Sequence, residues 1–396
     1  MTDLYSRRSF LAGVLAAGTL STTAGYALTR RSPVRLTLAT GADPTGARDL
    51  LIQMWNALHP DITLVAEVIS SSTQDQYAKF TETKADIFNL DVIHIPRFVA
   101  AGRLTPVSPG NEISLLTPLK RACLVAGSTD DYWAVPFNAD VGMLFRRVTD
   151  KRAIDDPPTL KDALATGDRQ LVGQLDTGGA QTDEAYVVNV LEHALAQDDA
   201  ILGEDGTVSF SLGQWRTALA PLAEAIRAKQ VWTEAGEDPS TATYSRQNVR
   251  YLRNWPVNYR ALDRSERLKP DTAEIRVGPL PVGILSGQNL AVARDSEHRR
   301  EAEQAIHFLT DTSAQKLLTS FGFAPTGLDA YIDPVLETAT PHLKAIRNAV
   351  DQSRPRPAHQ NYARFAKAFK DHTHAYLHDG EPLAQRFIQD LQEALT

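Results

Sequence analysis

The stretch AVPFNADVGMLFRR, residues 134–147, contains two short apolar runs separated by a polar tripeptide. The runs 134–137 and 141–145 predict two strands, and the residues between them predict a polar crossing. Such a segment can pass from one lobe of a protein to another. Asn138 and Asp140 suit the floor of a cleft for a hydroxyl-rich solute, because a carboxylate accepts hydrogen bonds from hydroxyl groups. An ordinary turn that favours Asn and Asp for local reasons is the alternative.

Length and composition favour a globular chain of two domains with a small-molecule partner. The 396 residues suffice for two buried cores. The formal charge of −7 and the scattered cations argue against nucleic acid, since phosphate binding needs clustered Lys and Arg. The single cysteine, Cys123, excludes an internal disulfide and is expected to be a buried small hydrophobic residue. We expect a monomer that needs no cofactor or metal.

The amino terminus reads as an export signal. SRRSFLAG places Arg7 and Arg8 directly before the apolar run 10–17, a pattern typical of twin-arginine signals. Small residues precede position 28, so we expect cleavage after Ala27, with residues 1–27 as the signal peptide. The apolar run is too short to predict a membrane span with assurance, and the sequence leaves open whether the signal is retained as an anchor. The mature chain is expected outside the cytoplasm.

The first third of the chain alternates predicted strands with helices and thus indicates an α/β sheet. Strands are expected at 34–39, 62–69 and 91–95, and a helix with one apolar face at 47–58. In such sheets ligands bind beyond the carboxyl ends of strands, where Asp91 or His94 would lie. A hydrogen-bonded structural role is the alternative for His94.

The rest of the chain repeats this alternation. Strands are expected at 170–175, 207–210, 276–281 and 286–293, and helices at 159–166, 184–196, 214–229, 301–309, 314–320, 341–350, 362–377 and 382–395. Trp255 precedes Pro256 and is biased to an extended backbone, with a new helix starting at the proline.

Several motifs resemble one family in order along the chain: YWAVPFNADVGMLFRR, NLDVIHIPRFVAAGRL, YLRNWPVNYRAL, VGPLP with SGQNLAVA, and FGFAPTG with RPAHQNY. The chain is similar to the extracellular solute-binding proteins of carbohydrate ABC importers, a group that includes trehalose/maltose-binding proteins. The resemblance implies a two-lobed α/β fold of the periplasmic-binding-protein type II, with a three-segment hinge and a ligand cleft. It places one lobe at 33–137 plus 286–324, and the other at 141–281 plus 328–396.

The resemblance also implies which residues bind ligand. In the family the first loop contacts ligand, a Trp in the NWP motif stacks on the sugar, and an Arg near the carboxyl terminus binds it. The expected ligand-binding residues are Asp43, Asp91, His94, Asn138, Asp140, Trp255, Gly287, Gln288 and Arg356. For Asp43 a turn before Pro44 is the alternative, and for Arg356 a solvated cation in a proline-rich turn.

Two departures from the family are visible. Family members commonly have Trp where this chain has Gln288, so a stacking surface is replaced by a hydrogen-bonding amide. Many relatives are lipoproteins with a Cys after the apolar run, but Thr19 stands here, so we expect no lipid anchor.

The expected function is binding of a small carbohydrate and delivery to ABC permease subunits. A ligand sensor for a receptor kinase is an alternative that the sequence does not distinguish. A secreted glycosidase is the other alternative, since Asp43, Asp91 and Asp140 supply acids, although no motif sets two of them in acid and nucleophile roles. Loss of Asp140 is expected to weaken binding without altering stability.

Overall fold

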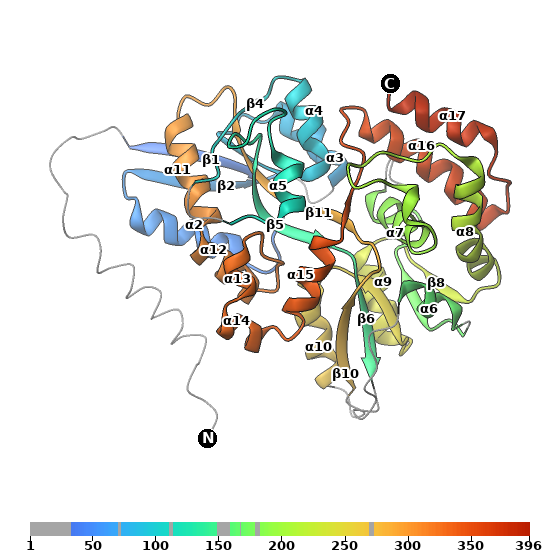
Figure 1. The fold of residues 1–396 in the computed structure, drawn as a ribbon. Coiled ribbons are helices and arrows are strands. Elements are labelled where there is room, and N and C mark those ends of the chain that lie inside the picture. The colour runs from blue at the N-terminus through green and yellow to red at the C-terminus, as the bar shows by residue number, and fades with distance from the viewer. Residues whose placement is uncertain are drawn as a thin grey trace.

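The computed structural model describes residues 33–69, 73–110, 114–148, 159–166, 168–178, 183–268 and 273–396. The predicted signal peptide therefore lies outside the described residues. Within them the chain forms two lobes, each built on its own sheet (Figure 1). None of the helices described is both long and apolar enough to cross a bilayer.

The first sheet contains seven strands within the described ranges, and β11 lies at its centre. The strands are β1 (Val34–Thr40), β2 (Ile62–Val68), β3 (Ile87–Asp91), β4 (Leu104–Thr105), β5 (Val135–Val141), β11 (Ile284–Ala293) and β12 (Arg354–Pro355). β1 is parallel to β2 and β3, whereas β11 is antiparallel to β3, β4 and β5. Because β11 pairs with β3, β4 and β5, this sheet is complete only after the chain has formed the second sheet and returned to the first.

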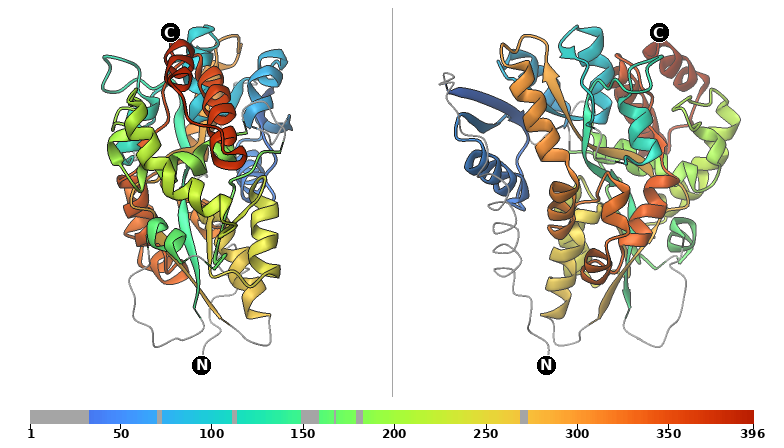
Figure 2. Two further views of the ribbon diagram at one scale, coloured as in Figure 1. Left: turned by 90° about the vertical axis from the view of Figure 1, so that its right-hand side faces the viewer. Right: turned by 60° about the vertical axis from the view of Figure 1, so that its left-hand side comes forward.

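Helices cover this sheet and bury their apolar faces against it: α2 (Ala47–Leu58), α3 (Thr73–Glu82), α4 (Ile95–Ala100), α5 (Thr117–Cys123), α11 (Arg299–Thr310) and α12 (Thr312–Ser320). In α2 the buried residues Leu51, Ile52 and Trp55 recur at helical spacing. The indole of Trp55 also donates to the carbonyl of Ile62 at 3.0 Å. α11 packs beside α2, although far from it in sequence (Figure 2, right).

The second sheet has five strands among the residues described, in the order β10-β6-β9-β7-β8. They are β6 (Met143–Val148), β7 (Leu171–Gly173), β8 (Val231–Thr233), β9 (Tyr251–Asn254) and β10 (Glu274–Pro279). The helices of this part of the chain are α6 (Leu160–Ala165), α7 (Glu184–Leu195), α8 (Leu212–Arg227), α9 (Glu237–Arg246) and α10 (Tyr259–Arg267), with the 3-10 turns η2 (Asp199–Ile201) and η3 (Pro256–Asn258). η3 starts at Pro256, as the sequence predicts.

The carboxyl-terminal helices pack on the second lobe. These are α13 (Leu328–Tyr331), α14 (Pro334–Ala339), α15 (Leu343–Asp351), α16 (Tyr362–His374) with the π-helical turn η4 (Ala375–Asp379), and α17 (Gln385–Ala394). Ile346 of α15 shares a buried cluster with Phe145 of β6. Trp215 of α8 lies 5.5 Å from the ring of Phe369 and 5.6 Å from that of Phe387, centroid to centroid.

The chain passes between the sheets at three places in the described ranges. β5 leads into β6 at Gly142, β10 leads back into β11, and the segment 321–327 crosses a third time beside β5, where Ala324 bridges Ala139. The path from β5 to β6 runs from the upper to the lower part of Figure 1. A Cβ on Gly142 would lie 2.2 Å from Oε1 of Glu192, so a side chain at this crossing would have to displace that buried carboxylate.

Three sequence predictions about local structure are wrong. The polar tripeptide 138–140 is not a crossing but part of β5, since its residues pair with 286–288 of β11. The strand expected at 91–95 ends at Asp91, whose side chain accepts from the Ile93 amide and starts the 3-10 turn η1 (Val92–His94). The strand expected at 207–210 is a single bridge between Leu202 and Val208.

Candidate ligand-binding site

A polar cavity of about 330 Å³ lies between the two sheets. Its lining residues come from the ends of β3, β5 and β9, from β11, and from the first turns of α7 and α9: Asp91, Asp140, Asp183, Glu184, Ala185, Val188, Glu237, Trp255, Val257, Ser286, Gly287, Gln288 and Arg356. The volume is within the range of small-molecule sites, roughly 300–1,000 Å³. Both lobes thus contribute to one cavity.

Six of the predicted residues line the cavity, and four of them, Asp91, Asp140, Gly287 and Gln288, meet there because β3, β5 and β11 are adjacent strands. Gln288 pairs with Asp91 on one side and with Asn138 on the other. Asn138 is itself buried and donates to Oδ2 of Asp140 at 3.3 Å. The register therefore brings together side chains that are about 50 and 200 positions apart in the sequence.

Asp140 is the most unusual group in the cavity. Its Oδ1 is inaccessible to solvent and has no hydrogen-bond partner among the residues that the structure describes. Burial, reinforced by Glu237 and Asp91, raises the pKa of Asp140 to about 8. Burying a polar oxygen without a hydrogen bond is costly, and Oδ1 of Asp140 therefore has an acceptor position that no described residue fills.

Trp255 forms an apolar wall of the cavity and is fixed on two sides. Its indole nitrogen donates to Glu237, and the Arg253 guanidinium lies 3.9 Å from the ring centroid. Arg253 is held by Glu192 through contacts of 2.6 and 2.9 Å. The indole is only 9% exposed, so the packing leaves little freedom to its orientation. An aromatic ring held in this way is a preorganised surface for a flat apolar face.

Arg356 joins the two lobes at the edge of the cavity. Its guanidinium contacts Oδ1 of Asp91 at 3.0 Å and Oε2 of Glu184 at 2.8 Å, and it donates to Oγ of Ser286 at 3.1 Å. Tyr362 donates to the same Glu184 carboxylate at 2.9 Å. Burial alone would lower the pKa of Arg356, but Asp91, Tyr362 and Glu184 outweigh it and raise the pKa. The arginine therefore stays charged and is not a solvated cation in a turn.

The cavity has a marked excess of carboxyl groups. Burial is the main cause of the raised pKa values of Asp183, Glu184 and Glu237. Sequence reasoning missed Glu184 and Glu237 as site residues, because each is the first residue of a helix, where an acidic side chain is expected for electrostatic reasons alone. Ser286 was missed as well, since a serine in a strand carries no distinct signal.

Gly287 lines the cavity through its backbone. Its φ of +132° is a conformation that residues with a side chain rarely adopt, and a Cβ would lie 2.3 Å from the carbonyl oxygen of Asn138. The glycine allows β5 and β11 to approach closely at the bulge next to Gln288. Its role is to hold Gln288 and Asp140 in place.

Asp43 does not line this cavity. Its carboxylate accepts from the amide and hydroxyl of Thr45 at 2.8 and 2.6 Å and from the amide of Arg48 at 2.9 Å. These bonds organise the turn before α2, in line with the alternative interpretation. A ligand contact for Asp43 is not supported by this placement and stays a prediction.

His94 lies beside the cavity rather than in it. With Tyr77 and Arg97 it lines a separate hollow of about 30 Å³, to which Glu184 and Tyr362 also contribute. The space is too small for a sugar, although it borders the Arg356 cluster.

A larger hollow of about 760 Å³ lies elsewhere, next to β12, and is lined by Pro118, Arg121, Ala122, Glu204, Asp205, Leu285, Asp351, Ser353, Arg354, Pro355 and Ala358. None of these residues is aromatic, and none is a residue that the sequence singles out. The smaller cavity is the better candidate because it combines an aromatic wall with buried, incompletely bonded polar groups.

The family model of the bacterial extracellular solute-binding proteins matches residues 39–316. The chain belongs to this family. The resemblance seen in the sequence is thus confirmed, and with it the two-lobed α/β fold. A curated relative, a probable ABC transporter-binding protein of Deinococcus radiodurans, is 25% identical over 251 residues. That match spans 57% of this chain and 58% of the relative.

Solved structures of solute-binding proteins share the fold. Maltose-bound MalE3 of T. maritima superposes with a TM-score of 0.77 at 23% identity, covering 91% of this chain and 99% of that one. The GacH receptor of Streptomyces glaucescens, whose structures are unliganded and with acarbose, gives 0.76 at 16% identity and covers 92% and 99%. At these identities the likeness concerns the fold of this solute-binding protein and leaves its ligand open.

Proposed function

We propose that this protein binds a small carbohydrate in the cavity between its lobes, outside the cytoplasm, and delivers it to the permease subunits of an ABC importer. The observation that carries the proposal is the buried, partnerless oxygen of Asp140 in the same cavity as the fixed indole of Trp255. Sugars offer hydroxyl donors and apolar CH faces, which match these two groups. Neighbours of the same fold whose structures hold maltose and α-D-tagatose support this ligand class.

The proposed mechanism is closure of the two lobes around the ligand. We assign 33–137 plus 286–324 to one lobe and 141–281 plus 328–396 to the other, with the three crossings as the hinge. Ser286 comes from the first of these lobes, and Glu237 from the second. A ligand that bonds to both stabilises the closed state more than the open one and so shifts the population. The closed form is the one that an importer would receive.

Binding without turnover is part of the proposal. The cavity holds several carboxyl groups, as a glycosidase would need, but the raised pKa of Asp140 also suits a group that donates or accepts hydrogen bonds to hydroxyls. A bound sugar recovered after hours at 25 °C should be unchanged by mass. A hydrolysed product would favour the glycosidase instead.

We further propose export through the twin-arginine route with no lipid on the mature chain. Replacing Arg7 and Arg8 by Lys should leave precursor in the cytoplasm, because that route recognises the arginine side chains. Secretion at an unchanged level, or a diacylglycerol adduct in the mass spectrum of the mature protein, would contradict this part.

The ligand is tested by calorimetry of the unaltered protein and two variants at position 288 against a panel of mono- and disaccharides. Gln288 lines the cavity where relatives commonly carry Trp, so Gln288→Ala should lose one hydrogen bond, about 1 kcal/mol or roughly fivefold in affinity. Gln288→Trp should weaken binding of the native ligand and strengthen binding of ordinary glucosides. The exposed Gln230 provides a matched control, and Gln230→Ala should change nothing. If no sugar binds to the unaltered protein, the proposal fails.

A further inference from the structure

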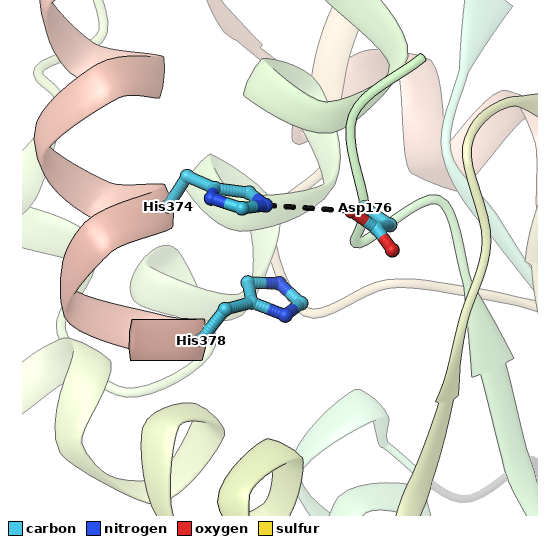
Figure 3. Close-up of side chains that lie close together, drawn as sticks. All are labelled: Asp176, His374 and His378. Atoms are coloured by element: carbon cyan, nitrogen blue, oxygen red, sulfur yellow. Dashed lines mark hydrogen bonds and ion pairs between the residues drawn. The ribbon is translucent and has the colours of Figure 1, made fainter. Parts of the chain in front are cut away.

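Outside the cavity, two histidines and an aspartate of the second lobe converge on one point (Figure 3). His374 is the last residue of α16, and His378 follows four positions later in η4. Asp176 lies on the loop after β7. Figure 3 shows both imidazole rings directed toward this loop. All three side chains are partly exposed, so an ion has access to them.

The distances fit a common ligand. Nε2 of His374 lies 3.3 Å from Oδ1 of Asp176, and one ligand atom from each of the three residues lies within 4.8 Å of the others. Two atoms bound to the same Zn²⁺ ion are at most about 4.4 Å apart, because each bond is about 2.0–2.2 Å long. Small side-chain rotations would therefore bring all three atoms into one coordination sphere.

The hydrogen bond that orients the His378 ring also suits a metal ligand. Its Nε2 lies 2.8 Å from the carbonyl oxygen of Leu175, which only accepts hydrogen bonds, so Nε2 carries the proton and Nδ1 carries the lone pair. Metal-binding histidines are typically oriented by such a bond from the second ring nitrogen.

The two imidazoles stack with centroids 4.4 Å apart and planes at 16°. A nearby histidine–aspartate pair that links α16 to α17 is different. His372 contacts Asp390 at 2.7 Å, and Asp390 is also paired with Arg386 at 2.6 Å, which makes an ordinary ion-pair network without a second histidine.

We propose that Asp176, His374 and His378 bind one divalent transition-metal ion of the Zn²⁺ class through two imidazole nitrogens and one carboxylate oxygen. Imidazole ligands favour Zn²⁺ and its neighbours, whereas Ca²⁺ and Mg²⁺ prefer oxygen ligands. The ion would tie the end of α16 to the loop after β7. This loop is also connected to the cavity. The Gly178 amide donates to Oδ2 of Asp183 at 2.6 Å, and Asp183 lines the cavity. The inference does not rest on the ligand being a sugar.

The test is titration of tag-free, metal-stripped protein with Zn²⁺, followed by calorimetry and by thermal melting. We expect one Zn²⁺ per chain and a melting temperature that rises with Zn²⁺ concentration. Asp176→Asn, His374→Gln and His378→Gln should each weaken the affinity about tenfold or more, while His372→Gln should not. Ca²⁺ and Mg²⁺ should have no effect on melting.

A spectroscopic readout keeps the proposal testable should a histidine variant fold poorly. Co²⁺ bound to the unaltered protein should give visible d–d absorption bands, and Asp176→Asn should reduce or shift them. Asp176 has a side chain that is 46% exposed, so this substitution should leave folding intact. The proposal is overturned if Zn²⁺ binds equally well to all three variants, which would place the ion elsewhere, or if no 1:1 binding occurs at millimolar Zn²⁺.

Discussion

The variant Asp140→Asn is expected to lose about one to two orders of magnitude in ligand affinity while it gains stability above neutral pH. Above about pH 8, where Asp140 is ionised, its desolvated, charged hydrogen bond to a ligand contributes roughly 1.5–3 kcal/mol to binding, which converts to about 10- to 100-fold in Kd. The substitution keeps the side-chain shape and an oxygen that accepts from Asn138. Only the ionisable group is removed.

The gain in stability follows from the direction of the pKa shift. Burial raises the pKa of Asp140 from 3.8 to about 8 on folding, so the folded protein holds the proton more tightly than the unfolded chain does. The stability that depends on this proton is fully present below about pH 4 and is lost as the pH rises through about 8. Above that pH the ligand-free protein contains a buried charge, at a cost on the order of a few kcal/mol.

Urea denaturation of the ligand-free protein between pH 4 and pH 9 measures this effect. The curves of Asp140→Asn and the unaltered protein should meet at the acidic end and diverge toward pH 8. Asp43→Asn is a matched control, because the Asp43 carboxylate caps the turn before α2 and does not line the cavity. It should cost about 1 kcal/mol of stability. Parallel curves for Asp140→Asn would show that its carboxylate is solvated.

Replacing Arg356 by Met is expected to destabilise the protein by about 3–5 kcal/mol and to abolish ligand binding. The substitution leaves the buried carboxylates of Asp91 and Glu184 without their common cation, and an uncompensated buried charge is costly. It also removes the contacts that connect the two lobes at the edge of the cavity. Chemical denaturation gives the stability change, and calorimetry gives the loss of binding.

The neighbouring arginine provides the control for Arg356. Arg354 lies 3.8 Å from the exposed Glu204, so Arg354→Met should lower the stability of the protein by less than about 1 kcal/mol. The double variant Arg356→Met with Glu184→Gln should recover part of the stability, since one of the two unpaired charges is then removed. Equal effects of the two arginine variants would mean that the Arg356 cluster is solvated.

These two residues show how the structure modifies what the sequence predicts. From the sequence, loss of Asp140 is expected to leave stability unchanged, because its carboxylate is assigned to ligand binding. In the structure Asp140 belongs to β5 and pairs with Ser286 across the sheet, so its side chain is desolvated. The sequence alone does not distinguish an aspartate shielded within a sheet from an aspartate in an exposed loop.

Local periodicity by itself determined several of the longer helices, because a helix depends on residues within one or two turns. The expected helix 47–58 is found as α2 (Ala47–Leu58), and the expected 184–196 as α7 (Glu184–Leu195). The ordered motifs also determined the family, the two-lobed fold and several polar residues that line the cavity. None of these inferences required a contact between distant positions.

Only the tertiary structure decided which charged groups share a partner and which are buried. Arg356 contacts Asp91 and Glu184, which precede it by 265 and 172 positions in the sequence. Asp176 contacts His374, which follows it by 198 positions. The crossing at Gly142 depends likewise on the Glu192 side chain that fills the space beside it. Such contacts are set by strand register and by packing between the lobes. The energy of a buried charge depends on all the groups around it, and these come from distant parts of the sequence.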